Sequence, residues 1–364
     1  MKKIDWYILQ KFLTTFFFSI FLFAVVSVVV DISEKADDFV KSGLTTKQIV
    51  MQYYIGFVPH IVALLFPLFV FIAVIFFTSK MAGRSEIIAI IASGTTYNRW
   101  MRPYWMGGIL LGLLLFYANH YVVPNANKIR GAFEAKYVDA NSSYENLIKS
   151  RGNDLYFRID SVTYAGMYNY DTVTKRGGPF FLNRIKNNKM YENIRSDAVQ
   201  WDTAKKNWRL EKVYQRDILG VQEKVTNIPL MNMNFNLKPA DFVSDKYTKD
   251  KLSSPELRHL INVGKVRGSE GLNELEVEAS RRDAAPVTVI LLTIIGAVIA
   301  GRKVRGGSGL HLATGFIIAA AFILTDRFST VFSTKGNLSP VLAAWIPNII
   351  FVFVVFYLYR KAPK

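Results

Sequence analysis

The chain has 364 residues, of which 51% are hydrophobic and 14% aromatic, and it carries a formal net charge of +17 at pH 7. It has no cysteine, which excludes disulfides and thiolate chemistry, and it has neither histidines with zinc-site spacing nor a GxxxxGKS/T phosphate loop. We therefore expect no metal, no cofactor and no catalytic residue, and we attribute the positive charge to cytoplasmic loops and anionic lipid rather than to nucleic acid.

The chain begins with a short basic and aromatic stretch, residues 1–11, which we expect to form an interfacial helix. The apolar run that follows could be a cleaved signal peptide, but it is long and no small-x-small cleavage site precedes Asp31. Further apolar runs recur along the chain, and each predicts a transmembrane helix. The expected spans are residues 12–30, 57–77, 104–123, 284–300, 310–325 and 340–359.

Between the second and third spans, residues 84–94 predict a short amphipathic helix. Ser85 is a candidate N-cap, Glu86 suits the positive first turn, and Gly94 is a candidate stop. Spacing at i, i+3 and i+4 gives one apolar face, formed by Ile87, Ile90 and Ile91. Such a face favours docking on a cytoplasmic partner; a helix lying in the membrane interface, or a simple hairpin cap, are the alternatives.

After the third span, residues 125–269 change in character, because short alternating segments separated by turn clusters predict a β-sandwich or jelly roll. The expected strands are residues 155–159, 163–170, 180–185, 190–198, 208–214 and 223–228. Towards the end of this insert, Ser254 followed by Pro255 predicts a helix start. The domains are therefore an N-terminal transmembrane half, residues 1–124, the β-insert, and a C-terminal transmembrane half, residues 270–364.

Lysine and arginine are concentrated in the short segments on one side of the expected spans. The positive-inside rule therefore places both termini, the 84–94 helix and the basic loop 301–309 in the cytoplasm, and the β-insert in the periplasm. Arg281 and Arg282 oppose this weakly, but acidic residues accompany them. The predicted fold class is a mixed α and β membrane protein: six transmembrane helices with a periplasmic β-jelly-roll domain inserted between helices 3 and 4.

Several short motifs, each weak alone, occur in a specific order and spacing along the whole chain. They are Arg84-Ser85-Glu86, Ala92-Ser93-Gly94, Val123-Pro124-Asn125-Ala126-Asn127, the loop 302–309, Gly336-Asn337-Leu338-Ser339-Pro340 and Ala343-Ala344-Trp345-Ile346-Pro347-Asn348. With these motifs and this topology, the chain resembles the YjgP/YjgQ permease family, the LptF/LptG permease subunits of the lipopolysaccharide export ABC transporter.

The resemblance implies a multi-pass permease of the bacterial inner membrane that extracts lipopolysaccharide for outer-membrane assembly and has no enzymatic activity of its own. The implied partners are a cytoplasmic ATPase dimer, a second permease subunit of the same family, and a periplasmic bridge protein with a jelly-roll fold and a single-span anchor. It makes residues 84–94 a coupling helix whose acid, Glu86, meets the ATPase. The other expected ATPase-coupling residues are Arg84, Ser85, Ile87, Ile90, Ile91 and Gly94.

The resemblance also leads us to expect basic residues near the lipid phosphates just after the first span. Here residues 31–38 are acidic instead. The candidates for the lipid path are Lys35, Lys41, Asp326 and Arg327. Asp326 and Arg327 are expected either to pair with each other at the outer membrane face or to form a helix end that reaches the interface.

Two other classes of function stay open at this point: an ion-coupled transporter, and a membrane receptor or scaffold with a β-sandwich sensor domain. An ion-coupled transporter requires ionisable residues within the membrane, and the expected spans offer little beyond His60 and Asp326. A receptor predicts no stable ATPase partner. Identification of the chains that co-purify in mild detergent would separate these classes.

Overall fold

The computed structural model describes residues 3–138, 153–171, 174–220, 222–234, 238–239, 248–267, 271–302 and 307–362. The chain forms two compact units, one helical and one built around a β-sheet. The helical unit comprises Met1–Tyr137, Lys249–Arg258 and Asn273–Lys364, and the second unit comprises Val138–Thr248 and His259–Leu272.

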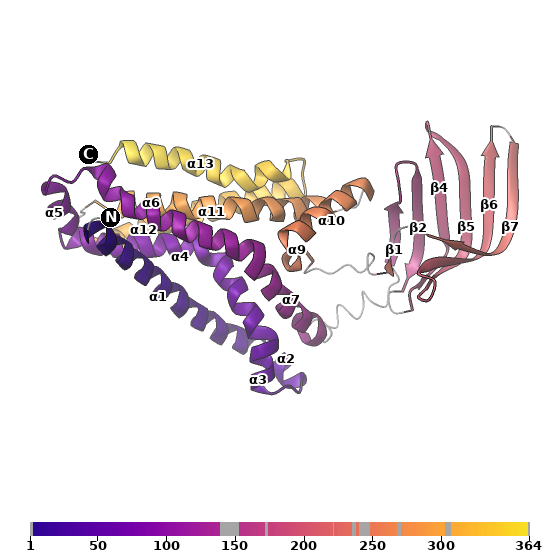
Figure 1. Ribbon diagram of the computed structural model, residues 1–364, viewed down its shortest axis with the longest axis horizontal. Helices are drawn as coiled ribbons and strands as arrows, with labels where there is room; N and C mark the ends of the chain where they lie inside the picture. Colours follow the sequence, from indigo (N-terminus) through magenta and orange to yellow (C-terminus); the bar gives the residue numbers. More distant parts are fainter. Residues whose placement is uncertain are drawn as a thin grey trace. The chain divides into compact units, whose positions relative to one another are not determined.

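Six helical segments in the described part of the chain are long and apolar enough to cross a membrane, which confirms the predicted architecture. Their principal helices are α1 (Lys3–Glu34), α4 (Ile55–Gly83), α6 (Tyr97–Tyr117), α11 (Leu272–Ala300), α12 (Gly307–Thr334) and α13 (Pro340–Arg360). Figure 1 shows them side by side, with both termini at one end of the helical unit. α1 is continuous, so the expected interfacial helix and the first span form one element.

Several helices extend beyond their expected ends. The expected fifth span stops at residue 325, whereas α12 continues to Thr334. The hydroxyl groups of Thr325, Ser329 and Thr330 donate to carbonyls four residues earlier, so these polar side chains are satisfied within the helix. Pro124, expected to end the third span, instead lies in the first turn of α7 (Val123–Phe133), which continues directly from η2 (Ala118–Val122).

In the part of the chain that the structure describes, three π-helical segments interrupt the α-helices: η1 (Val50–Tyr54), η2 (Ala118–Val122) and η3 (Glu134–Val138). They lie next to α7 or to the short helices α2 (Ala36–Lys41) and α3 (Thr46–Ile49), which connect α1 to η1. Figure 1 places α2, α3, α7 and α9 (Thr248–Lys251) away from the end that holds the chain termini. The helical unit therefore has two distinct ends.

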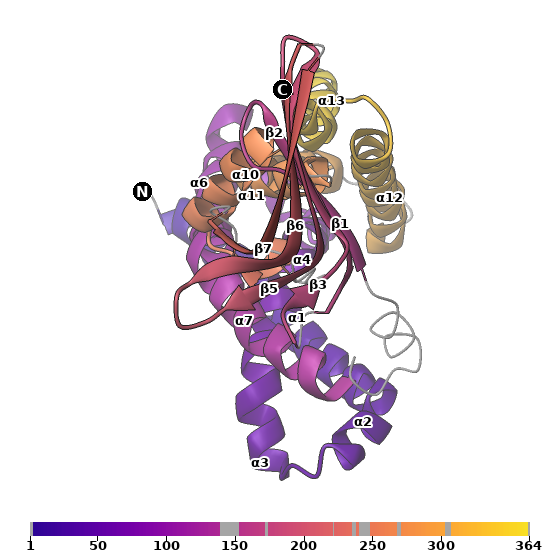
Figure 2. The ribbon, with the colours of Figure 1, turned by 90° about the vertical axis from the view of Figure 1, so that its right-hand side faces the viewer.

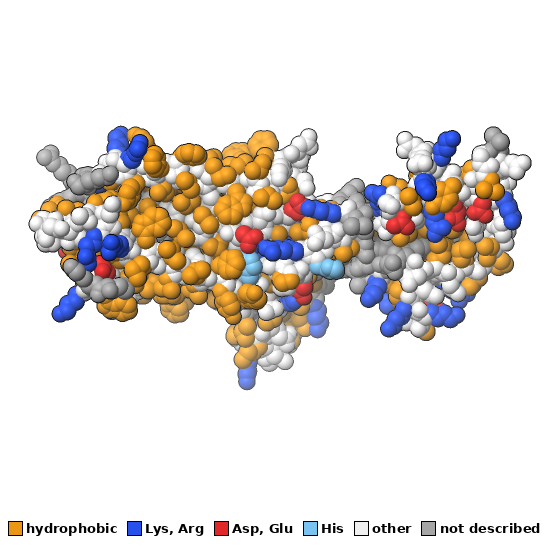
Figure 3. All heavy atoms as spheres, turned by 45° about the horizontal axis from the view of Figure 1, so that its top comes forward, with side chains coloured by type: hydrophobic (Ala, Val, Ile, Leu, Met, Phe, Trp, Pro, Cys, Tyr) orange, Lys and Arg blue, Asp and Glu red, His pale blue; other side chains and the backbone are white. Residues whose placement is uncertain are grey.

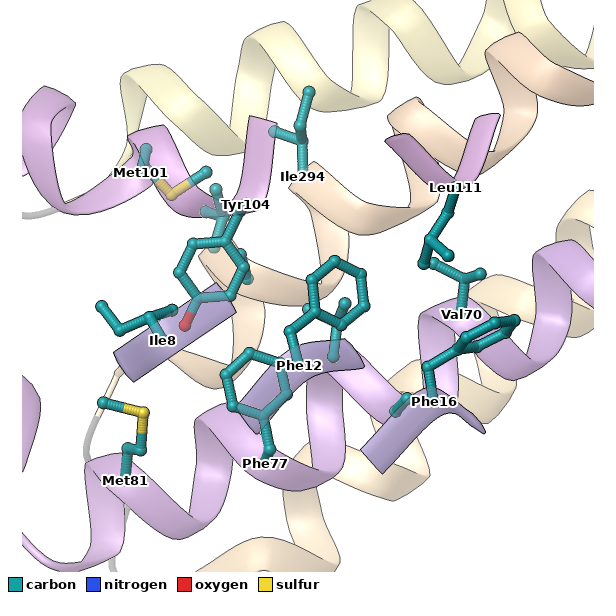
Figure 4. Packing of buried hydrophobic residues seen from close by; sticks show 14 of the residues in the cluster. Ile8, Phe12, Phe16, Val70, Phe77, Met81, Met101, Tyr104, Leu111 and Ile294 are labelled. Carbon is teal, nitrogen blue, oxygen red and sulfur yellow. The ribbon is translucent and has the colours of Figure 1, made fainter. Parts of the chain in front are cut away.

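Aromatic side chains from α1, α4 and α6 form the centre of the helical core (Figure 4). The ring of Phe77 stacks on Phe12 and on Tyr104, with centroids 5.7 and 5.6 Å apart. Gly107 permits this approach, because a Cβ at this position would lie 2.5 Å from the ring of Phe12. The buried hydroxyl of Tyr104 is satisfied by Thr78 at 3.0 Å.

The second unit contains one antiparallel sheet, which confirms the predicted β-domain between the third and fourth spans. Its strands are β1 (Asn153–Arg158), β2 (Thr163–Tyr170), β3 (Arg176–Gly177), β4 (Phe180–Lys186), β5 (Lys189–Asp202), β6 (Asn207–Leu219) and β7 (Gln222–Met233). Neighbours follow the order β1-β2-β4-β5-β6-β7, and β3 pairs with β5. Figure 2 shows the strands bending along their length. One face carries the core, including Met167, Leu182, Ile194 and Trp208.

Candidate functional site

The expected coupling helix forms α5 (Glu86–Ala92), at the end of the helical unit that holds the termini (Figure 1). The predicted side-chain cap at Ser85 is wrong: this residue adopts a left-handed conformation with φ of 60° and makes no capping hydrogen bond. Capping requires an extended backbone, which aims the hydroxyl at the first turn. Gly94 ends the helix as predicted, with φ of +82° and its N–H bonded to the Ile91 carbonyl at 3.0 Å.

The apolar face of α5 packs largely within the chain itself. Ile87 is only 2% exposed and Ile90 packs on the same core, together with Met81. The opposite side of the helix is open, because Ile88 is 52% exposed and Ile91 lies at its edge. A partner that docks on α5 would therefore meet Ile88 and Ile91 rather than Ile87.

Glu86 connects α5 to the start of α1. The hydroxyl of Tyr7 donates a hydrogen bond to Glu86 at 3.1 Å, and the guanidinium of Arg84 lies 3.9 Å from the same carboxylate. Arg84 is largely exposed, whereas Glu86 is half-buried. Any movement of α5 would therefore be transmitted to α1 through Glu86 and to α4 through the chain itself.

Lys35, a candidate for the lipid path, lies in a buried ionic cluster towards the other end of the helical unit. Its ammonium lies 3.0 Å from Asp31 and 3.1 Å from Glu134, which are only 6% and 7% exposed. The hydroxyls of Tyr53 and Tyr54 also donate to Asp31, at 2.9 and 3.0 Å. Lys35 is engaged by both buried carboxylates, and Arg130 also lies 3.9 Å from Glu134, so Lys35 is not free to hold a lipid phosphate in this conformation. Lys35 therefore connects α1, through Asp31, to η3, through Glu134.

The other lipid-path candidates differ in their partners. Lys41 is exposed in the last turn of α2. Asp326 does not pair with Arg327, because consecutive helical residues point about 100° apart. Instead Arg281 of α11 donates to Asp326 at 2.9 Å and to Thr330 at 2.7 Å. Arg327 is exposed and has no acidic partner in the described part of the chain.

A cavity of about 320 Å³ lies within the helical unit, mainly between α4, α11 and α12. Its apolar walls include Leu68, Leu292, Ala319 and Phe322. Its polar lining consists of His60, Asn119, Asn127, Asp250, Glu278, Arg281, Arg282, Thr288, Asp326 and Arg327. Figure 3 shows a helical surface that is mainly hydrophobic, with charged side chains near its ends. A cavity with charged and apolar walls is suited to an amphiphile.

Sequence reasoning assigned no site role to the charged residues at the start of α11. Arg282 is only 5% exposed and donates to Glu278 at 3.0 Å and to the carbonyls of Lys249 and Leu252 at 2.8 Å. It thus fixes α9 against α11. Its spacing of four residues from Glu278 was a visible signal of an ion pair on one helix face. The contact with α9 had no such signal.

A family model described as "Lipopolysaccharide export system permease LptF/LptG" matches residues 6–361, which include α5, the sheet and the cavity. The chain belongs to this family. Its similarity extends to the LptG proteins of Escherichia coli K12 and E. coli O6:H1 strain CFT073, each 21% identical over 364 residues and aligned over 98% of both chains. The LptF/LptG resemblance expected from the motifs is therefore confirmed.

Proposed function

We propose that this LptF/LptG family member is one permease subunit of an ATP-driven exporter that extracts lipopolysaccharide from the inner membrane and passes it to a periplasmic bridge. The family match across residues 6–361 carries this proposal, because it covers the helical unit and the sheet together. The partners would be an ATPase dimer, a second subunit of this family and a bridge protein with a jelly-roll fold and a single-span anchor.

The distribution of lysine and arginine supports an orientation with both termini and α5 in the cytoplasm and the sheet in the periplasm. In this orientation the ATPase dimer docks on α5. The exposed side chains Arg84, Ile88 and Ile91 provide the contact surface, and Glu86 carries the movement to α1 through Tyr7.

The lipid path is proposed to run past the exposed cations Lys41 and Arg327, whose charge is complementary to lipid phosphates. Lys35 would hold the end of α1 in place rather than bind lipid, since both of its nearest acids are buried. α1 and α12 expose large side chains along their length, such as Phe18, Phe21 and Phe316, which suit contact with acyl chains or with the second permease subunit.

Purification of the full chain in mild detergent tests the proposal directly. We expect an ATPase to co-purify in stoichiometric amount, and the reconstituted complex to release lipopolysaccharide from vesicles only when ATP is hydrolysed. Recovery of the chain without any ATPase would contradict the proposal and would favour an ion-coupled transporter or a receptor.

The variant Glu86→Lys tests the coupling role of α5. It reverses the charge that Tyr7 and Arg84 hold, so we expect it to insert normally and to bind the ATPase while transport is lost. Glu34→Lys, an exposed acid in the last turn of α1, is the matched control and should transport normally. Equal transport by the two variants would exclude Glu86 from coupling.

A further inference from the structure

The polar lining of the cavity contains a buried acceptor, Oδ1 of Asn127, that is not satisfied with normal geometry by any described residue. Asn127 is only 3% exposed, and its Nδ2 donates to the carbonyl of Asp250 at 3.0 Å. Because that carbonyl can only accept, the amide orientation is fixed with Oδ1 on the other side. Within the described residues, no donor reaches Oδ1 with normal geometry, although the ring of His60 lies beside Asn127 on the same lining. Burying an unsatisfied acceptor is costly, so this position is suited to a ligand that brings an N–H or O–H group.

A carboxylate accompanies this acceptor on the same lining. Asp250 belongs to α9 and has no ion pair with any described residue. Arg282 holds α9 in place by donating to the carbonyls of Lys249 and Leu252, so the position of Asp250 is fixed from α11. A carboxylate and a carboxamide oxygen are both acceptors, and together they match the three N–H donors and positive charge of a primary ammonium group.

Among the described residues that line the cavity, one cation is free to bind an anion. Arg281 is engaged by Asp326 and Thr330, and Arg282 by Glu278 and the α9 carbonyls. Arg327 lines the cavity from α12 and has no acidic partner in the described chain. A guanidinium pairs well with a phosphate through two parallel hydrogen bonds. One cavity therefore offers a free cation and a free anion, which is complementary to a zwitterion.

The remaining lining indicates that the ligand is a lipid. A narrow groove with only apolar lining lies between α4 and α12 and shares Leu68 and Ala319 with the cavity. Leu64 and Ile323 also line the cavity and are exposed, so its opening lies on the apolar surface of the helices. The volume of about 320 Å³ is near the lower limit of ligand pockets, about 300–1,000 Å³, and suits a small headgroup.

We propose that this cavity binds a glycerophospholipid whose zwitterionic headgroup has a primary amine, as in phosphatidylethanolamine. The phosphate lies at Arg327, the ammonium lies at Asp250 and Asn127, and the acyl chains leave the cavity past Leu64 and Ile323 onto the apolar surface of the helices. Because the proposed lipid path also passes Arg327, this lipid occupies the cavity when no exported lipid is bound there. The inference does not depend on the proposed transport function. The cavity would therefore hold a resident lipid between α4 and α12.

Lipid binding to the purified full chain tests this proposal. Native mass spectrometry in detergent, with phosphatidylethanolamine and phosphatidylcholine of identical acyl chains, compares headgroups of equal charge in which three N–H donors are replaced by methyl groups. We expect phosphatidylethanolamine to bind about tenfold more tightly or better, because hydrogen bonds to a charged group are lost with choline. Equal affinity for the two lipids would overturn the proposal.

Two substitutions locate the binding site. Asp250→Asn should lower the affinity for phosphatidylethanolamine about tenfold and leave that for phosphatidylglycerol, which has no amine, unchanged. Arg327→Gln should weaken both lipids, because both carry the phosphate. Asp37→Asn and Lys335→Gln, exposed residues that do not line the cavity, are the matched controls.

Two results would contradict the assignment even if the lipids bind. One is that Asp250→Asn and Asp37→Asn give the same affinity while thermal unfolding shows both variants folded. The other is that purified lipopolysaccharide displaces phosphatidylethanolamine stoichiometrically and that Arg327→Gln, but not Asp250→Asn, prevents this. The second result would assign the cavity to the exported lipid, without affecting the proposed transport function.

Discussion

The two ends of the helical unit use charge in opposite ways. At the end with α5 and the termini, apolar side chains such as Ile87 and Trp100 are buried and the charge of Arg84 is exposed, although Asp5 is buried there and lies 3.8 Å from Arg99. Towards the other end, Asp31, Glu134 and Arg282 are buried and are satisfied by ion pairs and hydrogen bonds. The first arrangement leaves a surface open to a partner, whereas the second ties helices to one another.

The two kinds of contact respond differently when one side chain is removed by substitution. A buried ion pair gives little net stability, yet removing one partner leaves an uncompensated charge. An apolar contact loses only the area and packing of the deleted atoms. We therefore expect the charged end to be more sensitive to single substitutions than the α5 end.

The largest expected effect is at Lys35. Lys35→Met leaves Asp31 buried without a cation, whereas Glu134 keeps Arg130 at 3.9 Å, and the variant should destabilise the helical unit by about 3–5 kcal/mol. Lys41→Met, an exposed lysine on α2, should change stability by no more than about 0.5 kcal/mol. Thermal unfolding in detergent measures both variants. Equal unfolding temperatures would contradict the proposed difference between the two ends.

At the α5 end, two adjacent isoleucines separate packing from docking. Ile87→Ala removes a buried side chain and should cost about 2 kcal/mol or more, as measured by the same unfolding experiment. Ile88→Ala should leave stability within about 0.5 kcal/mol of wild type but reduce the amount of ATPase that co-purifies. If both variants retained the ATPase equally, the exposed face of α5 would not be its docking surface.

A smaller effect is expected where α4 approaches α7. A Cβ at Gly56 would lie 2.3 Å from the carbonyl oxygen of Ala126, and this backbone cannot easily move, so Gly56→Ala should cost about 1–3 kcal/mol. Gly83→Ala, in the last turn of the same helix, meets no atom within 4 Å and should be neutral or stabilising by up to about 1 kcal/mol. If Gly56→Ala did not change the free energy of unfolding, α4 and α7 would be able to move apart without losing stability.

The smallest effect concerns an exposed carboxylate. Ser253 donates to Glu256 through its hydroxyl and its N–H, at 2.7 and 2.8 Å, and holds the pKa of Glu256 below its usual 4.5. A carboxyl with a depressed folded pKa stabilises the protein above its unfolded pKa, and this contribution disappears as the pH falls through the folded value. Unfolding temperatures between pH 5 and about pH 3 should therefore decline less steeply in Glu256→Gln than in wild type. A parallel decline in both would exclude this contribution.

Much of the architecture was predictable because it depends on local patterns. Long apolar runs specify spans wherever a backbone must satisfy its own hydrogen bonds in lipid. Alternation over residues 163–170 and 208–214 specified strands, since one face of the sheet is buried. The helix stop at Gly94 was also predictable, because glycine readily takes the left-handed conformation.

The features that were missed depend on residues far apart in the sequence. Lys35 is a lipid-path candidate by composition, but its partner Glu134 is 99 residues away. Ser85 has the side chain of an N-cap, yet the turn between α4 and α5 imposes a positive φ that prevents capping. The orientation of the Asn127 amide is fixed because its Nδ2 donates to the backbone carbonyl of Asp250, which lies 123 residues away in α9.

The π-helical segments make the charged end unusually dependent on chain length. A π turn is an α-helix with one extra residue, so deleting one residue from Ala118–Val122 would restore a regular α-helix without breaking its hydrogen-bond ladder. Every side chain after the deletion would, however, be rotated by about 100°. Asn127 and Glu134 would then turn away from Asp250 and Lys35. A single-residue deletion here would thus preserve the backbone hydrogen bonds of the helix but break the contacts of Asn127 and Glu134 with neighbouring segments.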